Sequence, residues 1–176
     1  MKEKDIRKIQ LQSFIAIDFE TADHGHESAC SVAMILVKDQ QIIERAHHLI
    51  RPPRKKFTFT DIHGIKWEDV ADKPTFAELW PTLTRILKNV SFFVAHNAVF
   101  NQSVLNSCCR AAGIHPPPIP FKCTMELARR ALNLYPTKLP DVCRHLKIDL
   151  IHHNALSDAE ACALIYINLQ KSKKVR

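Results

Sequence analysis

Two acidic residues with a two-residue spacing interrupt an apolar run near the start of the chain. The run SFIAIDF, residues 13–19, has the length of a strand buried on both faces, and Asp18 and Glu20 lie near its end. Alternate residues of a strand project from the same face, so both carboxylates are expected to point the same way. An ionised acid in apolar surroundings is costly unless it is paired or bound to a metal ion. The pair is therefore a candidate metal site, although two solvated acids at a strand end give the same pattern.

Two further polar segments could contribute to the same site. The segment HNAVFN, residues 96–101, follows a second short apolar run, and polar residues after a strand commonly face a functional site. A simple turn into a helix is its alternative interpretation. The segment HNALSD, residues 153–158, brings a histidine and an acid to the start of the last predicted helix. Taken without the other segments, Asp158 is explained by its place in the first turn of a helix, where the helix dipole favours a carboxylate.

The glycine content excludes two common ways of binding phosphate. Glycine occurs only 3 times, at positions 25, 64 and 113, so neither a GxGxxG motif nor a P-loop can form. A protein of this composition would handle phosphate through metal ions, basic side chains or helix N-termini. The formal net charge of +7 favours a polyanionic partner, although it is weak evidence alone.

The apolar pattern predicts one α/β domain with a mixed sheet, spanning residues 1–176 with a core from about 13 to 169. Strands are expected at 13–19, 29–38, 41–50 and 91–96, with a hairpin turn at Asp39 and Gln40. Helices are expected at 75–89, 99–112, 126–132, 141–146 and 155–169. Pro140 is expected at the first helical position and Asn154 as an N-cap. Residues 1–12 and the tail KSKKVR are charged and expected to be frayed or disordered.

Cysteine spacing and the apolar runs bound the location of the protein. The six cysteines form no CxxC pair and no zinc-binding spacing, so we expect them to be small core residues in a reducing compartment, the cytoplasm. The first ten residues contain no apolar signal-peptide segment, and no apolar run is long enough for a membrane span. No membrane partner is expected.

Taken together, the three polar segments resemble the motifs of the DnaQ-like, or DEDDh, exonuclease family. That family carries a D-x-E on the first strand, an H-N-x-x-F-D segment before a middle helix and an H-x4-D near the last helix. The matching residues here are Asp18-Phe19-Glu20-Thr21, His96 to Asn101, and His153 to Asp158. The segment Ile62-His63-Gly64-Ile65, followed by Pro74-Thr75-Phe76, also looks like the bacterial epsilon-type members. The resemblance implies a ribonuclease H-like fold, a five-stranded mixed sheet flanked by helices.

The resemblance implies a 3′–5′ exonuclease that uses two divalent ions, Mg²⁺ or Mn²⁺, held by carboxylate oxygens. It makes Asp18, Glu20 and Asp158 the metal ligands and His153 the general base for the attacking water. It places the terminal nucleotide against Phe19, Thr21, Ile62, His63, Ile65, His96, Asn97 and Phe100. The expected substrates are single-stranded 3′ ends, with DNA favoured over RNA.

One position departs from the family pattern, because Asn101 stands where the second motif has an acid. Asparagine keeps an oxygen but loses the charge, so the carboxylate set falls from four to three, with Asn101 reaching a metal ion through water at most. No Asp or Glu occurs between Glu78 and Glu126 that could replace it locally. The asparagine could be native to an active enzyme, mark a weakened or inactive member, or be an engineered substitution.

Two other functions remain open. One is a non-catalytic nucleic-acid-binding module, or one associated with a DNA polymerase catalytic subunit. The other is an oligoribonuclease-like enzyme that trims RNA. The chain ends soon after the last predicted helix, which favours a free-standing nuclease over a proofreading subunit.

Overall fold

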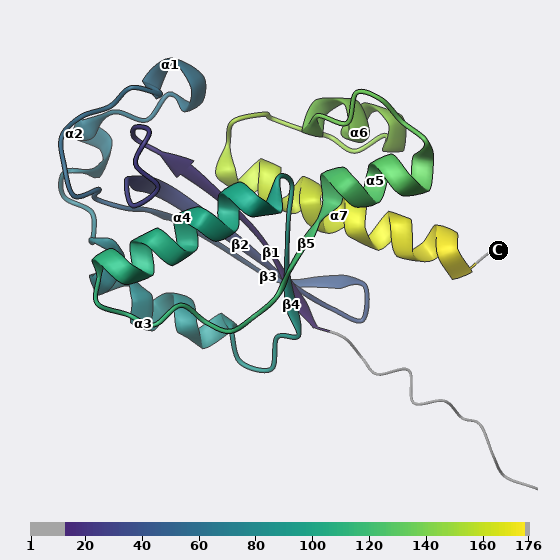
Figure 1. Cartoon of the computed structure of the whole chain (residues 1–176), viewed down its shortest axis with the longest axis horizontal. Helices are drawn as coiled ribbons and strands as arrows, with labels where there is room; N and C mark the ends of the chain where they lie inside the picture. The colour runs from purple at the N-terminus through teal and green to yellow at the C-terminus, as the bar shows by residue number, and fades with distance from the viewer. Residues whose placement is uncertain (1–12, 175–176) are drawn as a thin grey trace, which may run out of the picture.

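A five-stranded mixed sheet lies at the centre of the computed structural model, which describes residues 13–174 (Figure 1). Its strands are β1 (Phe14–Thr21), β2 (Ala29–Lys38), β3 (Gln41–Leu49), β4 (Phe92–Ala95) and β5 (Phe121–Cys123). Their order is β3-β2-β1-β4-β5. Strand β2 runs antiparallel to β1 and β3, whereas β4 is parallel to β1 and β5 is parallel to β4. The expected α/β class with a five-stranded mixed sheet is confirmed.

Helices cover both faces of the sheet (Figure 1). The helices α3 (Phe76–Ile86) and α4 (Ala98–Ala111) pack on one face, where Ile15, Ile17 and Phe19 of β1 join their core. On the other face lie α5 (Thr124–Leu132), α6 (Leu139–Leu146) and α7 (Ala155–Lys174), against Phe14 and Ala16. The short helices α1 (Thr60–His63) and α2 (Trp67–Val70) follow β3. Strand β1 is thus buried on both sides, which explains its nearly continuous apolar run.

The hairpin and the cap of the last helix form as predicted. Asp39 and Gln40, between β2 and β3, have φ angles of 54° and 63°, the left-handed values that a tight hairpin turn requires. The Oδ1 atom of Asn154 accepts a hydrogen bond from the backbone N–H of Ser157 at 3.1 Å, which caps α7.

Several boundaries differ from the sequence predictions. Strand β1 extends through Thr21, so Asp18 and Glu20 lie inside the strand. Helix α6 begins at Leu139, which makes Pro140 its second residue. Helix α7 continues to Lys174, so the first four residues of KSKKVR are helical, because no Gly or Pro interrupts residues 155–174. The three-residue strand β5 and the helices α1 and α2 were not predicted, because such short elements show no periodicity. The lead-in at 1–12 lies outside the described residues.

The burial of the thiols agrees with the expectation that the cysteines are small core residues. All six cysteines are free thiols, and every one except the half-buried Cys123 is buried. None of the helices in residues 13–174 combines the length and apolar character needed to cross a bilayer.

Candidate active site

The alternation of β1 places its two acids on the face that α7 covers. Asp18 and Glu20 follow Phe14 and Ala16 at two-residue steps, so they share the α5–α7 face of the sheet. Asp158 lies in the first turn of α7. One carboxylate oxygen from each of the three acids lies within 4.8 Å of the others, and no fourth acid among residues 13–174 joins this group. The acid cluster thus joins residues from the two ends of the chain.

Burial and mutual repulsion make the cluster a poor place for three unneutralised charges. The pKa of Asp18 lies well above its usual range because of desolvation, with repulsion from Glu20 and Asp158 adding to it. Desolvation, followed by repulsion from Asp158, raises the pKa of Glu20 to about 7. No lysine or arginine in the described part of the chain forms an ion pair with any of the three. Clustered carboxylate oxygens without a lysine or arginine partner fit a hard divalent cation such as Mg²⁺ or Mn²⁺.

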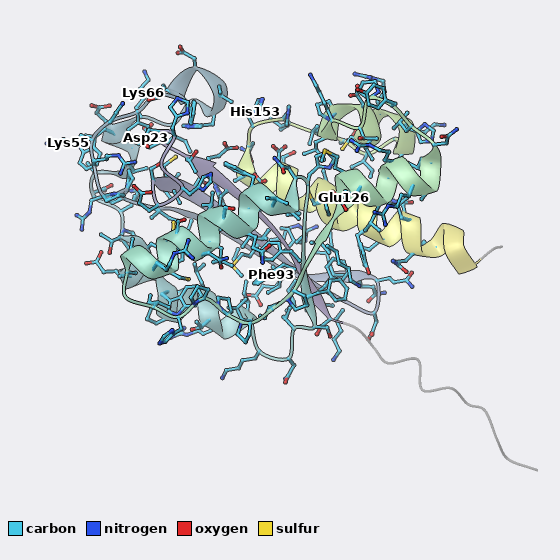
Figure 2. All side chains as sticks on the ribbon, viewed as in Figure 1. Asp23, Lys55, Lys66, Phe93, Glu126 and His153 are labelled. Atoms are coloured by element: carbon cyan, nitrogen blue, oxygen red, sulfur yellow. The ribbon has the colours of Figure 1, made fainter. Side chains whose placement is uncertain are left out.

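The loop before α7 brings two adjacent histidines to Asp158. The Nδ1 atom of His152 lies 3.1 Å from the Oδ2 atom of Asp158, and the backbone N–H of His153 donates to the same oxygen at 3.1 Å. A left-handed backbone at His153, with φ of 64°, allows this contact, and the two imidazoles stack with centroids 3.8 Å apart. Figure 2 shows His153 beside the start of α7. Desolvation, then the neighbouring His152, lowers the pKa of His153, while Asp158 partly opposes this shift. The sequence interpretation missed His152, although the adjacent pair of histidines was visible.

Asn101 is buried against the acid cluster, with 1% of its surface exposed. Its Oδ1 atom accepts a hydrogen bond from the backbone N–H of Phe19 at 3.1 Å. Its Nδ2 atom donates to the backbone oxygen of His96 at 3.3 Å and to Oδ1 of Asp18 at 3.4 Å. The second-motif residue therefore contacts β1 and one of the acids directly.

A cavity of about 200 Å³ opens beside the acid cluster. Five of the residues predicted to contact a nucleotide line it, namely Phe19, Thr21, Ile62, His63 and Phe100, together with Glu20 and Phe59. Glu20 belongs to both the cavity and the cluster, so a group held in the cavity would lie next to the carboxylates. Phe59 was not predicted, because it precedes the recognised 62–65 segment and carries no motif of its own.

Three of the predicted contact residues lie outside this cavity. Ile65 packs with Trp67 against the small core around Val70. The ring of His96 lies 2.9 Å from both Thr124 Oγ1 and the backbone oxygen of Thr137, so it links β4 to the α5–α6 side of the site. Asn97 is exposed at the N-cap of α4.

The wall of the cavity is braced by the loop between β1 and β2. The exposed rings of His24 and His26 meet Phe59 and Phe100 edge to face, with centroids 4.8 Å and 5.7 Å apart. Arg54, in the basic segment RPPRKK at residues 51–56, bonds both Asp23 and Glu27 of this loop, so it holds the loop in place. Figure 2 shows Asp23, Lys55 and Lys66 gathered near α1 and α2.

His63 and Trp67 have structural contacts on the same side. The backbone N–H of Ile65 donates to Nδ1 of His63, whose Nε2 lies 3.1 Å from the backbone oxygen of Thr21. This pattern requires a neutral ring with its proton on Nε2, and desolvation lowers the pKa of His63 accordingly. Trp67 is half-buried beneath Lys55 and packs against the small core around Val70.

Comparisons with known proteins agree on one family. The exonuclease (RNase_T) family model matches residues 15–166. The chain is 28% identical over 166 residues to the PolC-type DNA polymerase III of Thermotoga petrophila, covering 92% of this chain and 12% of that protein. It is 26% identical to the 3′–5′ exonuclease DinG of Bacillus subtilis, covering 90% of this chain and 18% of that protein. The chain therefore spans only a small part of these curated relatives.

Solved structures show the same fold. Exonuclease X in complex with 5′ overhanging duplex DNA is 27% identical, with a TM-score of 0.75 over 92% of this chain and 93% of that one. The nuclease domain of 3′hExo, a DEDDh family member bound to rAMP, is 18% identical, with a TM-score of 0.79 over 93% and 94% of the two chains. The expected ribonuclease H-like fold is confirmed.

Proposed function

This chain belongs to the RNase_T exonuclease family, and we propose that it removes nucleoside monophosphates from single-stranded 3′ ends, with DNA favoured over RNA. One observation carries the proposal. The three-carboxylate cluster and the 200 Å³ cavity share Glu20, so a terminal nucleotide in the cavity would present its phosphate to the cluster. The positive net charge of the chain favours a polyanionic substrate around this acidic centre.

In this proposal Asp18, Glu20 and Asp158 hold two divalent ions. Such ions neutralise charge on the transferred phosphate and make water more acidic. His153 accepts a proton from the attacking water, a task that suits a side chain titrating near neutral pH. The water oxygen forms a bond to phosphorus, the bond to the 3′ oxygen of the preceding nucleotide breaks, and that oxygen takes up a proton. Phe19, Ile62 and Phe100 orient the terminal nucleotide in the cavity.

Cleavage of end-labelled strands tests this function. The wild-type chain with Mg²⁺ or Mn²⁺ should shorten 5′-labelled single-stranded DNA stepwise and release the label of a 3′-labelled strand as a monophosphate. Asp158→Asn should lose at least about 100-fold in rate, because the bound ions supply several kcal/mol of transition-state stabilisation. Asp149→Asn, which changes an exposed acid in the loop before α7, is the matched control. Absence of cleavage with either ion would overturn the proposal, and competition with short RNA would separate the RNA-trimming alternative.

Asn101 favours a second candidate, a module that binds single-stranded nucleic acid without cleaving it. Binding without cleavage by the wild type, together with cleavage by Asn101→Asp, would support this candidate.

The PolC-type relatives support association with a DNA polymerase catalytic subunit as a further proposal, which gel filtration of the mixed proteins would test. The six free thiols support the proposal that the protein works in the reducing cytoplasm.

A further inference from the structure

The amide of Asn101 turns its oxygen toward the backbone of β1 and its NH2 group toward Asp18. We infer that Asn101 is a positioning residue, which fixes Asp18 and the backbone of β1 before any metal ion binds, and that it is not itself a metal ligand. The structural part of this inference stands alone, whereas its consequence for metal binding rests on the proposed function.

The partners of Asn101 fix the orientation of its amide. The backbone N–H of Phe19 requires an acceptor at 3.1 Å, which Oδ1 provides. The backbone oxygen of His96 and Oδ1 of Asp18 both require a donor, at 3.3 Å and 3.4 Å, and the two hydrogens of Nδ2 serve them. If the amide were reversed, its NH2 group would face the N–H group of Phe19, and its oxygen would face the oxygens of His96 and Asp18. Only an amide combines an acceptor for the N–H group of Phe19 with a donor group for the two oxygens of His96 and Asp18.

A carboxylate at position 101 would lose two of these three hydrogen bonds. Its first oxygen would still accept from Phe19, but its second would face the oxygens of Asp18 and His96 with no hydrogen between them. Because the position is buried and three acids are already close together, this repulsion would be weakly screened. An acid therefore suits position 101 only when a cation or a proton lies between it and Asp18. The asparagine satisfies its neighbours with neither a cation nor a proton between it and Asp18.

This arrangement sets how many ions the protein can hold alone. Three carboxylates carry at most three negative charges, and Asn101 turns its NH2 group toward Asp18 and its oxygen toward the backbone N–H of Phe19. We therefore expect one divalent ion to bind firmly to the nucleotide-free protein. The second ion needs oxygen ligands from the substrate phosphate, since Mg²⁺ and Mn²⁺ are commonly held by substrate phosphates together with one or two carboxylates.

Calorimetry with Mn²⁺, with and without a nucleoside monophosphate, tests the metal stoichiometry. The wild type should bind one ion alone and two with the nucleotide, whereas Asn101→Asp should bind two in both conditions. Asn106→Asp adds the same charge farther along α4, away from the cluster, and should behave as the wild type. Two firm ions in the nucleotide-free wild type would overturn the inference.

Thermal unfolding in a chelator tests the structural part without metal or activity. Asn101→Asp should unfold at a lower temperature than the wild type and Asn106→Asp, and Mn²⁺ should raise its melting temperature more than theirs. Asn101→Leu keeps similar bulk but removes every hydrogen bond, so its folded form should bind Mn²⁺ about 10-fold or more weakly, as other losses of supporting residues do. An Asn101→Asp protein as stable as the wild type in chelator, or an Asn101→Leu protein with unchanged Mn²⁺ affinity, would refute the positioning role. These readouts are independent of cleavage, so a wild type without nuclease activity would contradict the proposed function and leave them intact.

Discussion

The Nδ1 atom of His152 lies 3.1 Å from Oδ2 of Asp158, so the first histidine of the adjacent pair, not the second, contacts the carboxylate through its ring. His153 contributes only its backbone N–H to that oxygen, and its exposed ring makes no hydrogen bond within the described residues. The loop thus uses one imidazole to hold an acid and leaves the other available to a water molecule. This division of roles separates the effects expected from the two histidines.

Replacing each histidine by alanine tests this division. His153→Ala should lower kcat by about 100-fold or more, the usual contribution of a general base, whereas His152→Ala should lower it less and weaken metal binding. The pKa of His153 is lowered, so its neutral form should persist to a more acidic pH than for an ordinary histidine. The cleavage rate of the wild type should therefore decline only at a pH below the usual pKa of histidine. A larger loss of kcat in His152→Ala than in His153→Ala would reverse the two roles.

The cavity predicts a separate effect on substrate affinity. Ile62 lines the cavity with half of its surface exposed, so Ile62→Ala removes apolar contact with little effect on the core. We expect KM for a single-stranded 3′ end to rise several-fold, about 1 kcal/mol for the lost contact, with kcat nearly unchanged. Ile43→Ala is the matched control, because Ile43 is similarly exposed but lies on the edge strand β3. Equal KM values for the two variants would show that the cavity does not hold the terminal nucleotide.

Strand periodicity could predict the face that carries chemistry, because Asp18 and Glu20 follow the two-residue repeat of a buried strand. The same repeat places them toward α7, but which helix covers that face depends on packing between distant segments. The contact between Asp158 and β1 was therefore expected only from family resemblance. The sequence shows which residue types each motif contains, but only the family resemblance indicated that the three motifs lie together in the fold.

Partners that depend on three-dimensional contact could not be predicted. Phe59 and His152 lie next to recognised segments, yet nothing in their own spacing distinguishes them from surface residues. The hydrogen-bond pattern of Asn101 depends on the backbone of Phe19, which lies 82 positions earlier in the chain. The sequence shows a missing charge at position 101, and only the geometry shows that an amide fits there.

The acid cluster predicts that the metal-free protein loses stability as the pH rises. The pKa of Glu20 is about 7 in the folded protein and 4.5 for the free side chain, so the folded state binds more protons between these values. Stability then falls as the pH rises through this window, by on the order of 3 kcal/mol from this residue, and levels off above it. Melting curves in chelator should show this decline, and Glu20→Gln should weaken it. Mg²⁺ should raise the melting temperature most at the alkaline end, and a pH-independent effect of Mg²⁺ would contradict the prediction.

The ion pairs of Arg54 predict the opposite dependence on pH. Arg54 bonds both oxygens of Asp23, which is 4% exposed, so Arg54→Ala would leave a buried carboxylate without its partner. We expect a loss of about 1–3 kcal/mol in the free energy of unfolding near neutral pH. Hydrogen bonding to Arg54 lowers the pKa of Asp23, so this contribution is present above the unfolded-state pKa and is lost as the pH falls through the folded-state pKa. Urea unfolding should therefore show a large deficit for Arg54→Ala at neutral pH and a small one in acid, with exposed Lys56→Ala as the control. A deficit that stays constant across this range would mean that Arg54 stabilises the loop by packing and not by its charge.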